Sequence, residues 1–88
     1  MRLDEASDAL LAQRSADVDD RAFAVVVRRH APYLRAFAVR YMGSTLEADD
    51  VVQESLLVAW RRIGDLRDPF QVRSWLTTTV ARRATDVA

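Results

Sequence analysis

The sequence contains no cysteine and no lysine, and it has only two glycines and two prolines among its 88 residues. Without cysteine, neither a disulfide framework nor a thiolate metal site is available, so stability must come from packing. The scarcity of glycine and proline, together with the lack of apolar–polar alternation, favours helices joined by short turns. A chain of this length has room for one core. We therefore predict a single all-α domain, a compact bundle of three to four helices.

Long apolar runs are also missing from the chain. The longest, residues 22–27 and 55–60, are far shorter than the roughly 20 residues that a membrane helix needs. The acidic segment 4–8 does not look like a basic and apolar secretion signal. We therefore expect no membrane insertion and a cytoplasmic location.

Charge is balanced overall but unevenly distributed. The 13 basic residues, all arginine, offset 13 acidic ones. Residues 1–20 and 46–60 are acidic, whereas 21–45 and 61–88 are basic. A net charge of zero gives no general argument for binding nucleic acid. Two interpretations stay open for the blocks: solvated helix faces that attract one another, or local binding surfaces.

The residues that usually carry catalysis or bind metal are sparse. His30 is the single histidine and lies on an apolar helical stripe, so we expect it in the core. Asp49, Asp50 and Glu54 would lie on an exposed helix face, without the burial that tunes an acid–base pair. No glycine-rich phosphate loop occurs. We predict no catalytic residue, no metal and no cofactor.

Capping residues and hydrophobic spacing set the expected helices. They cover about Leu3–Arg14, Asp20 to Gly43, Leu46–Ile63, and Val72 or Arg73 to the end, with a loop over Gly64–Arg73. Asp17, Asp19 or Asp20 caps the second helix, and Ser44 or Thr45 caps the third. Pro32 predicts either a kink or a junction of two helices.

The apolar spacing also predicts which side chains form the core. In the second helix these are Phe23, Val26, Val27, His30, Leu34, Phe37, Ala38 and Tyr41. In the third helix they are Val51, Val52, Leu56, Ala59, Trp60 and Ile63. Trp75 is placed in the core because large aromatic residues are scarce in so small a domain.

Three motifs at consistent spacing resemble a known family. Residues 47–60 read EADDVVQESLLVAW, residues 28–32 read RRHAP after Ala22 and Phe23, and residues 70–76 read FQVRSWL. These stretches resemble region 2 of sigma-70 family sigma factors, and within it the extracytoplasmic-function (ECF) group. The resemblance covers about residues 20–88.

The resemblance implies a partner for the third helix. In this family that helix docks on the clamp coiled coil of the largest subunit of RNA polymerase core. The positions implied to bind the polymerase are Asp50, Gln53 and Glu54, with Leu56 as an apolar neighbour. Within the domain, the alternative is an acidic face paired to Arg28, Arg29 or Arg35.

The resemblance also implies that the domain recognises and opens the promoter −10 element. The family traps an extruded base of the non-template strand in the loop before the last helix, which is residues 66–72 here. The implied DNA-binding residues are Arg61, Leu66, Arg67, Phe70, Gln71, Arg73, Thr78, Arg82 and Arg83. Thr78 and Thr79 stand where primary sigma factors carry adjacent tryptophans, so we expect opening to depend on the loop.

The domain division follows from the same resemblance. Residues 1–19 form an acidic segment with a short helix, either a regulatory arm or an additional packed helix, and residues 20–88 form region 2. The helix-turn-helix that reads the −35 element in this family is absent, so we expect the natural protein to continue beyond Ala88 or this chain to be an excised fragment.

An anti-sigma factor is a further implied partner, because such inhibitors cover the same surfaces. Two other function classes remain. One is a helical adaptor of sigma-like fold that binds protein and not promoter DNA. The other is a small helical enzyme or regulatory subunit, which would require a ligand pocket of which the sequence gives no sign.

Overall fold

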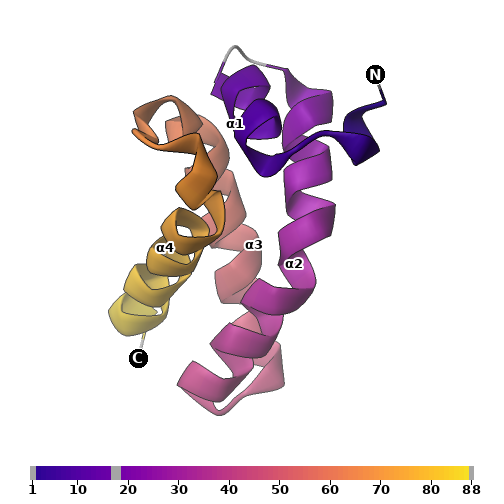
Figure 1. The fold of residues 1–88 in the computed structure, drawn as a ribbon. Coiled ribbons are helices and arrows are strands. Elements are labelled where there is room, and N and C mark those ends of the chain that lie inside the picture. Colours follow the sequence, from indigo (N-terminus) through magenta and orange to yellow (C-terminus); the bar gives the residue numbers. More distant parts are fainter. Residues whose placement is uncertain (1, 17–18, 88) are drawn as a thin grey trace.

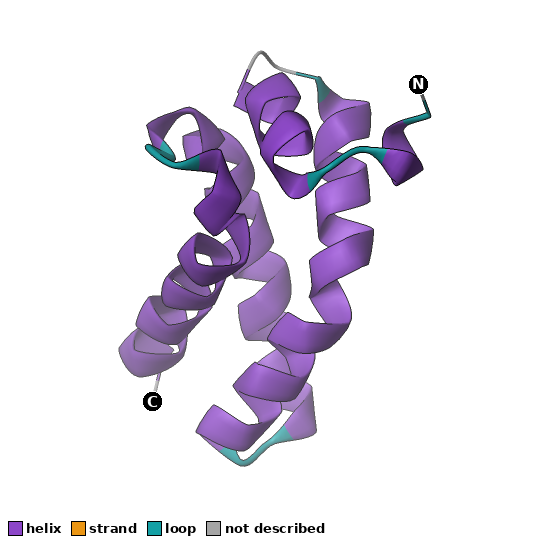
Figure 2. Cartoon of the chain, in the orientation of Figure 1, coloured by secondary structure: helices purple, strands orange, loops and turns teal. Residues whose placement is uncertain are grey.

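The computed structural model describes residues 2–16 and 19–87, which are almost entirely helical (Figure 2). In chain order the elements are η1 (Leu3–Glu5), α1 (Asp8–Ala16), α2 (Asp20–Met42), α3 (Thr45–Arg62), η2 (Ile63–Asp65), η3 (Pro69–Gln71) and α4 (Val72–Val87). No strand occurs in these two ranges. The prediction of an all-α bundle is confirmed.

Three longer helices form the body of the bundle (Figure 1). Helices α2 and α3 run antiparallel around a short turn, and α4 packs against both of them. The short helix α1 packs against α2 and against η2 and η3, the two turns that connect α3 to α4. The connection between α3 and α4 therefore lies at the same end of the molecule as α1.

Helix α2 begins and ends where its capping residues predict. The Asp19 carboxylate accepts hydrogen bonds from the backbone N–H groups of Arg21 (3.1 Å) and Ala22 (3.3 Å). At the other end Gly43 adopts a left-handed φ of 72° and donates its N–H to Val39 O at 2.8 Å. Glycine suits this conformation because it has no Cβ to clash with the following carbonyl.

The chain passes through Pro32 without leaving the helix, so α2 is one helix and not two. A proline in a helix removes one backbone hydrogen bond. Tertiary packing offsets that loss, since Val26, Leu34 and Ala38 on the same helix are fully buried. Asp17, one of the three capping residues considered above, lies outside the described residues.

The prediction of one helix over Leu3–Arg14 is wrong. The 3-10 turn η1 ends at Glu5, Ala6 is extended, and α1 starts only at Asp8. The Ser7 hydroxyl accepts a hydrogen bond from Leu10 N–H at 3.2 Å, so Ser7 caps the new helix. Ala6 is buried, which fixes the chain at the break.

Capped turns also shape the segment after α2. Ser44 caps α3 by accepting from Glu47 N–H at 3.3 Å. The loop expected over Gly64–Arg73 contains the turns η2 and η3, and α4 starts at Val72. The Asp68 carboxylate accepts from Phe70 N–H at 3.0 Å and thereby starts η3.

The core lies between the three long helices and α1. Its largest fully buried side chains are Leu11, Val26, His30, Leu34, Ser55, Val72, Leu76 and Val80. The prediction of a core histidine is confirmed. Two aromatic predictions are wrong, because Trp60 is 40% exposed and Tyr41 is 53% exposed. Trp75 is partly buried against the core.

No helix in the described part of the chain is both long and apolar enough to cross a membrane.

Candidate functional site

The outer face of α3 presents apolar side chains next to α2. Leu56, Leu57 and Trp60 of α3 face Phe23 and Val27 of α2 across an open groove. The rest of the lining is Asp20, Ala24 and Gln53. We call this the α2–α3 groove. Leu57 is 60% exposed, so the groove presents apolar surface to water. This exposure is unfavourable in free energy, and a bound partner would remove it.

The predicted polymerase-binding residues do not all lie at this groove. Gln53 and Leu56 line it, and Asp50, one turn before Gln53, is exposed on the same helix. Glu54 instead contacts α4, where its carboxylate accepts a hydrogen bond from Arg83 Nε at 2.6 Å. The structure therefore brings together Gln53 and Leu56, with Asp50 close by along the helix, and separates Glu54 from them.

Trp60 is a groove residue that sequence reasoning placed in the core. It follows Gln53 by seven residues and Leu56 by four, so all three lie on one side of a helix. That spacing was available in the sequence. The prediction followed the apolar spacing of the third helix, which does not distinguish an apolar side chain exposed in a groove from one buried in the core.

A second surface surrounds the connection between α3 and α4. A hollow of about 470 Å³ is lined there by Asp65, Leu66, Arg67, Asp68, Gln71, Ser74, Trp75, Thr78, Thr79 and Arg82. We call it the loop hollow. Five predicted DNA-binding residues line it: Leu66, Arg67, Gln71, Thr78 and Arg82. Its volume falls in the range of roughly 300–1,000 Å³ that is typical of small-ligand sites.

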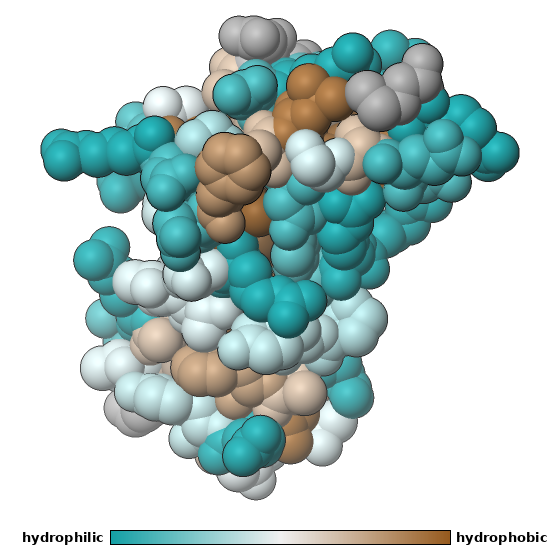
Figure 3. Space-filling model, viewed as in Figure 1, coloured by the Kyte–Doolittle hydropathy of each residue, from teal (hydrophilic) through white to brown (hydrophobic). Residues whose placement is uncertain are grey.

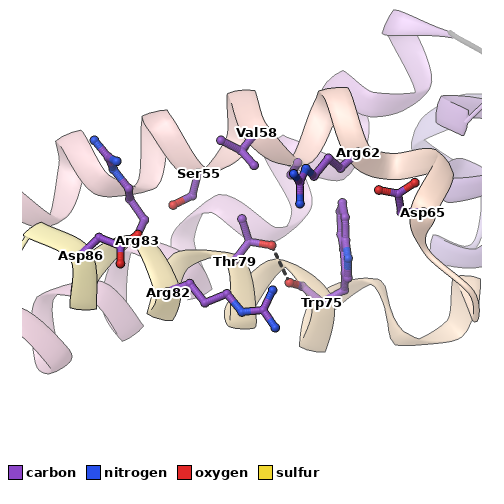
Figure 4. A pocket seen from close by; sticks show the side chains of 10 residues that line it. Ser55, Val58, Arg62, Asp65, Trp75, Thr79, Arg82, Arg83 and Asp86 are labelled. Carbon is purple, nitrogen blue, oxygen red and sulfur yellow. Dashed lines mark hydrogen bonds between the residues drawn. The ribbon is translucent and has the colours of Figure 1, made fainter.

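A neighbouring cavity of about 400 Å³ lies between α3 and α4. Figure 4 shows Arg62 reaching toward it from α3, with Trp75 and Arg82 projecting from α4. Trp75, Thr79 and Arg82 line this cavity and the loop hollow alike, so the two form one continuous surface. From the sequence, Arg62 was expected to add to the positive field for phosphates, but it was not among the implied DNA-binding residues.

The remaining predicted DNA-binding residues lie outside the lining of the loop hollow, although Arg83 lines the neighbouring cavity. Phe70 is 80% exposed in η3 and lies outside the lining of the hollow. Arg61 is exposed on α3. Arg83 pairs with Glu54. Arg73 donates from Nε to His30 Nδ1 at 3.2 Å, and its guanidinium lies 4.4 Å from the centre of the Tyr33 ring.

Some residues of the acidic and basic segments form ion pairs with one another within the domain. Arg35 Nε donates to Asp49 at 2.6 Å, which matches the alternative of an internally paired acidic face. Arg29 pairs instead with Asp8 of α1, at 2.7 Å. Asp50 makes no ion pair within the described ranges. Internal pairing therefore accounts for Asp49 and leaves Asp50 available for another molecule.

Asp8 has a perturbed acidity. Burial raises the pKa of its carboxyl, but the hydrogen bond and charge of Arg29 and the nearby His30 ring N–H lower it more, so the pKa lies below the ordinary value. The carboxylate is therefore ionised at neutral pH. The described residues contain no group of three or more acidic or histidine side chains placed to hold a metal ion.

Comparison with known proteins identifies the family. The model of the Sigma-70 region 2 family matches residues 26–87. The chain belongs to this family. The expected likeness to region 2 of an ECF sigma factor is thereby confirmed. The matched range includes the loop hollow and most of the groove lining, but leaves out η1, α1 and the first turns of α2, with the groove residues Asp20, Phe23 and Ala24.

Curated relatives are sigma factors as well. The ECF RNA polymerase sigma factor SigL of Mycobacterium tuberculosis is 48% identical over 56 residues, 60% of this chain and 30% of the relative. RNA polymerase sigma factor NccH of Alcaligenes xylosoxydans xylosoxydans is 33% identical over 73 residues, 83% of this chain and 39% of the relative.

RNA polymerase sigma factor CnrH of Cupriavidus metallidurans is 33% identical over 72 residues, 82% of this chain and 38% of the relative. This sigma region 2 chain thus spans between 30% and 39% of the length of these relatives. No solved structure matches the chain significantly.

Proposed function

We propose that this chain is the sigma-factor domain that binds RNA polymerase core and recognises and opens the promoter −10 element. One observation carries the proposal. Residues that the resemblance implies for the two partners lie on two separate surfaces, with Gln53 and Leu56 at the α2–α3 groove and Leu66, Gln71 and Arg82 at the loop hollow. A protein that joins polymerase to DNA needs two such surfaces.

The α2–α3 groove is the proposed contact with the clamp coiled coil of the largest polymerase subunit. Protein interfaces commonly combine a buried aromatic anchor with a polar rim. Trp60 and Leu57 supply exposed apolar area, and Gln53 and Asp50 supply polar groups beside it. Asp50 has no ion-pair partner among the described residues, so its carboxylate is available to a basic side chain of the partner.

The loop hollow is the proposed site for a base of the non-template strand. Taking a base out of the stack costs a few kcal/mol, which a pocket offsets by stacking and by hydrogen bonds to the base edge. Leu66 and Trp75 offer apolar surface, Gln71 offers an amide, and Arg67 and Arg82 attract the flanking phosphates.

The threonines of α4 support a mechanism that depends on the hollow. The Thr78 and Thr79 hydroxyls donate to Ser74 O (3.0 Å) and Trp75 O (2.9 Å) in their own helix. Side chains this short offer no ring that could replace a stacked base. Separation of the strands in this domain is therefore assigned to capture of a base in the hollow.

An anti-sigma factor is proposed as a further partner, because a helix laid in the α2–α3 groove would exclude the polymerase. Amphipathic helices bind in apolar grooves of this kind. A substitution of Trp60 that weakens binding to polymerase core should weaken binding to such an inhibitor as well.

The experiment measures binding of the chain to a fluorescent pool of single-stranded −10 oligonucleotides with polymerase core present. Wild type is compared with Gln53→Ala, which alters the groove, and Arg82→Ala, which alters the hollow. We expect sequence-dependent binding that requires core, that is lost with Gln53→Ala, and that falls about tenfold with Arg82→Ala.

A helical adaptor is the outcome that would replace this proposal. If core binds the chain and Gln53→Ala abolishes that binding, but no oligonucleotide binds even at low salt, the groove serves a protein partner alone.

A further inference from the structure

The N-terminal helix α1 lies against the part of the molecule proposed to read DNA. It packs on both turns between α3 and α4, η2 and η3, and buries Leu11 and Ala12 in the common core. Figure 1 shows this indigo helix beside the orange connection at one end of the bundle. The family match begins at residue 26, so nothing in the match assigns a role to α1.

A chain of polar contacts connects α1 to α4 through α2. Asp8, the first residue of α1, accepts a hydrogen bond from Arg29 Nη1 at 2.7 Å. Its second oxygen lies 3.0 Å from Nε2 of His30, which is 2% exposed. The other ring nitrogen of His30, Nδ1, accepts from Arg73 Nε at 3.2 Å. Each histidine nitrogen thus faces a different helix.

The proton positions on His30 follow from these partners. Arg73 can only donate, so Nδ1 carries the lone pair and Nε2 carries the hydrogen that points toward Asp8. The Nε2 contact is too poorly aligned for a full hydrogen bond. This nitrogen is the one buried side-chain nitrogen or oxygen in the described ranges without such a bond. The Asp8 carboxylate alone then compensates the partial positive charge of this buried N–H group. Removing the carboxylate would leave the N–H group buried and unpaired.

Arg73 connects these contacts of Asp8 and His30 to the loop hollow. It is the second residue of α4, and Gln71, Ser74 and Trp75 around it all line the hollow. Its guanidinium is held between His30 and the face of the Tyr33 ring. A side chain held in this way fixes where α4 starts and so fixes the wall of the hollow.

We infer that α1 sets the shape of the loop hollow through the chain Asp8–His30–Arg73, and that these three are positioning residues for recognition of the −10 base. This inference rests on the proposed function of the hollow. Arg73 then acts within the protein and not as a phosphate ligand.

The test uses Asp8→Asn, which keeps the shape of the side chain and removes its charge. Asp4→Asn is the matched control, because Asp4 is an exposed acid of the same segment whose carboxylate forms an ion pair with Arg2. Backbone amide hydrogen exchange is measured over residues 66–75 and, as an internal reference, over 48–59. We expect exchange in 66–75 to rise about tenfold more than in 48–59 for Asp8→Asn, with the control unchanged in both segments.

A second measurement compares the oligonucleotide that binds best with one mismatched at the captured base, in the presence of core. We expect Asp8→Asn to reduce the ratio of the two affinities about threefold or more, while affinity for core stays the same. A parallel loss of affinity for core, or exchange that rises equally over 66–75 and 48–59, would mean that Asp8 only stabilises the fold and would overturn the inference.

A double-mutant cycle makes the test independent of overall stability. Arg73→Met keeps an unbranched side chain but removes the guanidinium, and with it both the donor to His30 and the contact with the Tyr33 ring. Residues that act through one another give non-additive effects. The double variant, Asp8→Asn with Arg73→Met, should therefore exchange about as fast over 66–75 as either single variant. Additive effects would overturn the inference. If wild type shows no sequence-dependent binding, the proposed function fails, while the exchange data still decide whether α1 controls the hollow.

Discussion

At the scale of single residues, Glu54 and Arg83 form an ion pair that lies outside the lining of both the groove and the loop hollow. The pair spans α3 and α4, and both side chains are nearly half exposed, at 49% and 43%. Exposed ion pairs contribute only about 0–1 kcal/mol. The pair therefore opens at little cost, and either residue becomes available to a partner when the other is engaged. Glu54 and Arg83 remain candidates for polymerase and DNA contact on that basis.

Trp60 provides the first prediction at this scale. Because its side chain is exposed in the α2–α3 groove, Trp60→Ala should cost little stability but weaken core binding by about 2 kcal/mol, roughly thirtyfold, as buried aromatic anchors do at interfaces. Titration of labelled chain with core measures this. Leu46→Ala is the control, since Leu46 is 77% exposed and lies outside the groove. Equal effects of the two substitutions would refute the assignment of the groove.

Asp8 provides the second prediction, in the pH dependence of stability. The pKa of its carboxyl is lower in the folded chain than the ordinary value of 3.8. Its contribution is thus present above about pH 4 and is lost as pH falls through the lower, folded-state pKa. Asp8→Asn should reduce the free energy of unfolding by about 1 kcal/mol at pH 7 and less at pH 3. Urea unfolding at the two pH values measures the difference; an equal loss at both would contradict it.

At the scale of elements, the turn between α2 and α3 sets the antiparallel pairing of the two helices that line the groove. The left-handed Gly43 ends α2, and Ser44 at once caps α3. The groove lies at the other end of this helix pair, where the first turns of α2 face the second half of α3.

Gly43 gives a prediction at this scale. Gly43→Ala places a Cβ in a left-handed conformation and should destabilise the fold by about 1 kcal/mol, although open space surrounds the position. Gly64→Ala is the matched control, because Gly64 also faces open space but lacks a positive φ. Its effect should be neutral or slightly stabilising. Chemical denaturation decides, and equal stabilities for the two variants would contradict the argument.

The sequence predicted the elements well wherever capping chemistry is local. Asp19, Gly43 and Ser44 mark helix ends through contacts within a few residues, so those boundaries could be predicted. The break at Ala6 was missed because it depends on burial of that residue in the bundle. The contacts of Arg73 with His30 and of Arg83 with Glu54 join residues 43 and 29 positions apart. No local pattern encodes such pairs.

In the candidate site, too, local features could be predicted from the sequence and tertiary contacts could not. The motifs placed Gln53 and Leu56 on one helix face and Leu66 and Gln71 in the connection, because helical spacing and turn residues are local properties. Which charged groups remain available depends on the tertiary structure. In that structure Glu54, Arg73 and Arg83 form hydrogen bonds with residues of other helices.

At the scale of the whole molecule, the charge distribution matters more than the net charge of zero. Figure 3 shows teal, hydrophilic residues over much of the upper part of this face, around brown patches, and paler and brown residues over most of the lower part. The loop hollow and the neighbouring cavity together carry four arginines, Arg62, Arg67, Arg82 and Arg83, against three acids, Asp65, Asp68 and Asp86. Arginines therefore slightly outnumber acids on this surface of a neutral domain, which favours phosphate groups there.

This distribution gives a prediction for salt dependence. If Arg67 and Arg82, with Arg62 beside them, neutralise about two or three phosphates, log Kd for a single-stranded oligonucleotide should change with log salt by a slope of about 1.4–2.1. Titrations between low and moderate salt in the presence of core measure the slope. Arg67→Ala should reduce it by about 0.7. A steep slope that Arg67→Ala leaves unchanged would indicate phosphate contacts elsewhere on the domain.

The central claim is that the loop hollow captures an extruded base once polymerase is bound. Duplexes carrying 2-aminopurine at successive non-template positions of the −10 element test it directly, because this base fluoresces more strongly when it leaves the stack. With the chain and core together, we predict a rise at one position that Arg82→Ala and Gln71→Ala reduce and that requires core. No rise at any position, or an equal rise with core alone, would contradict the account.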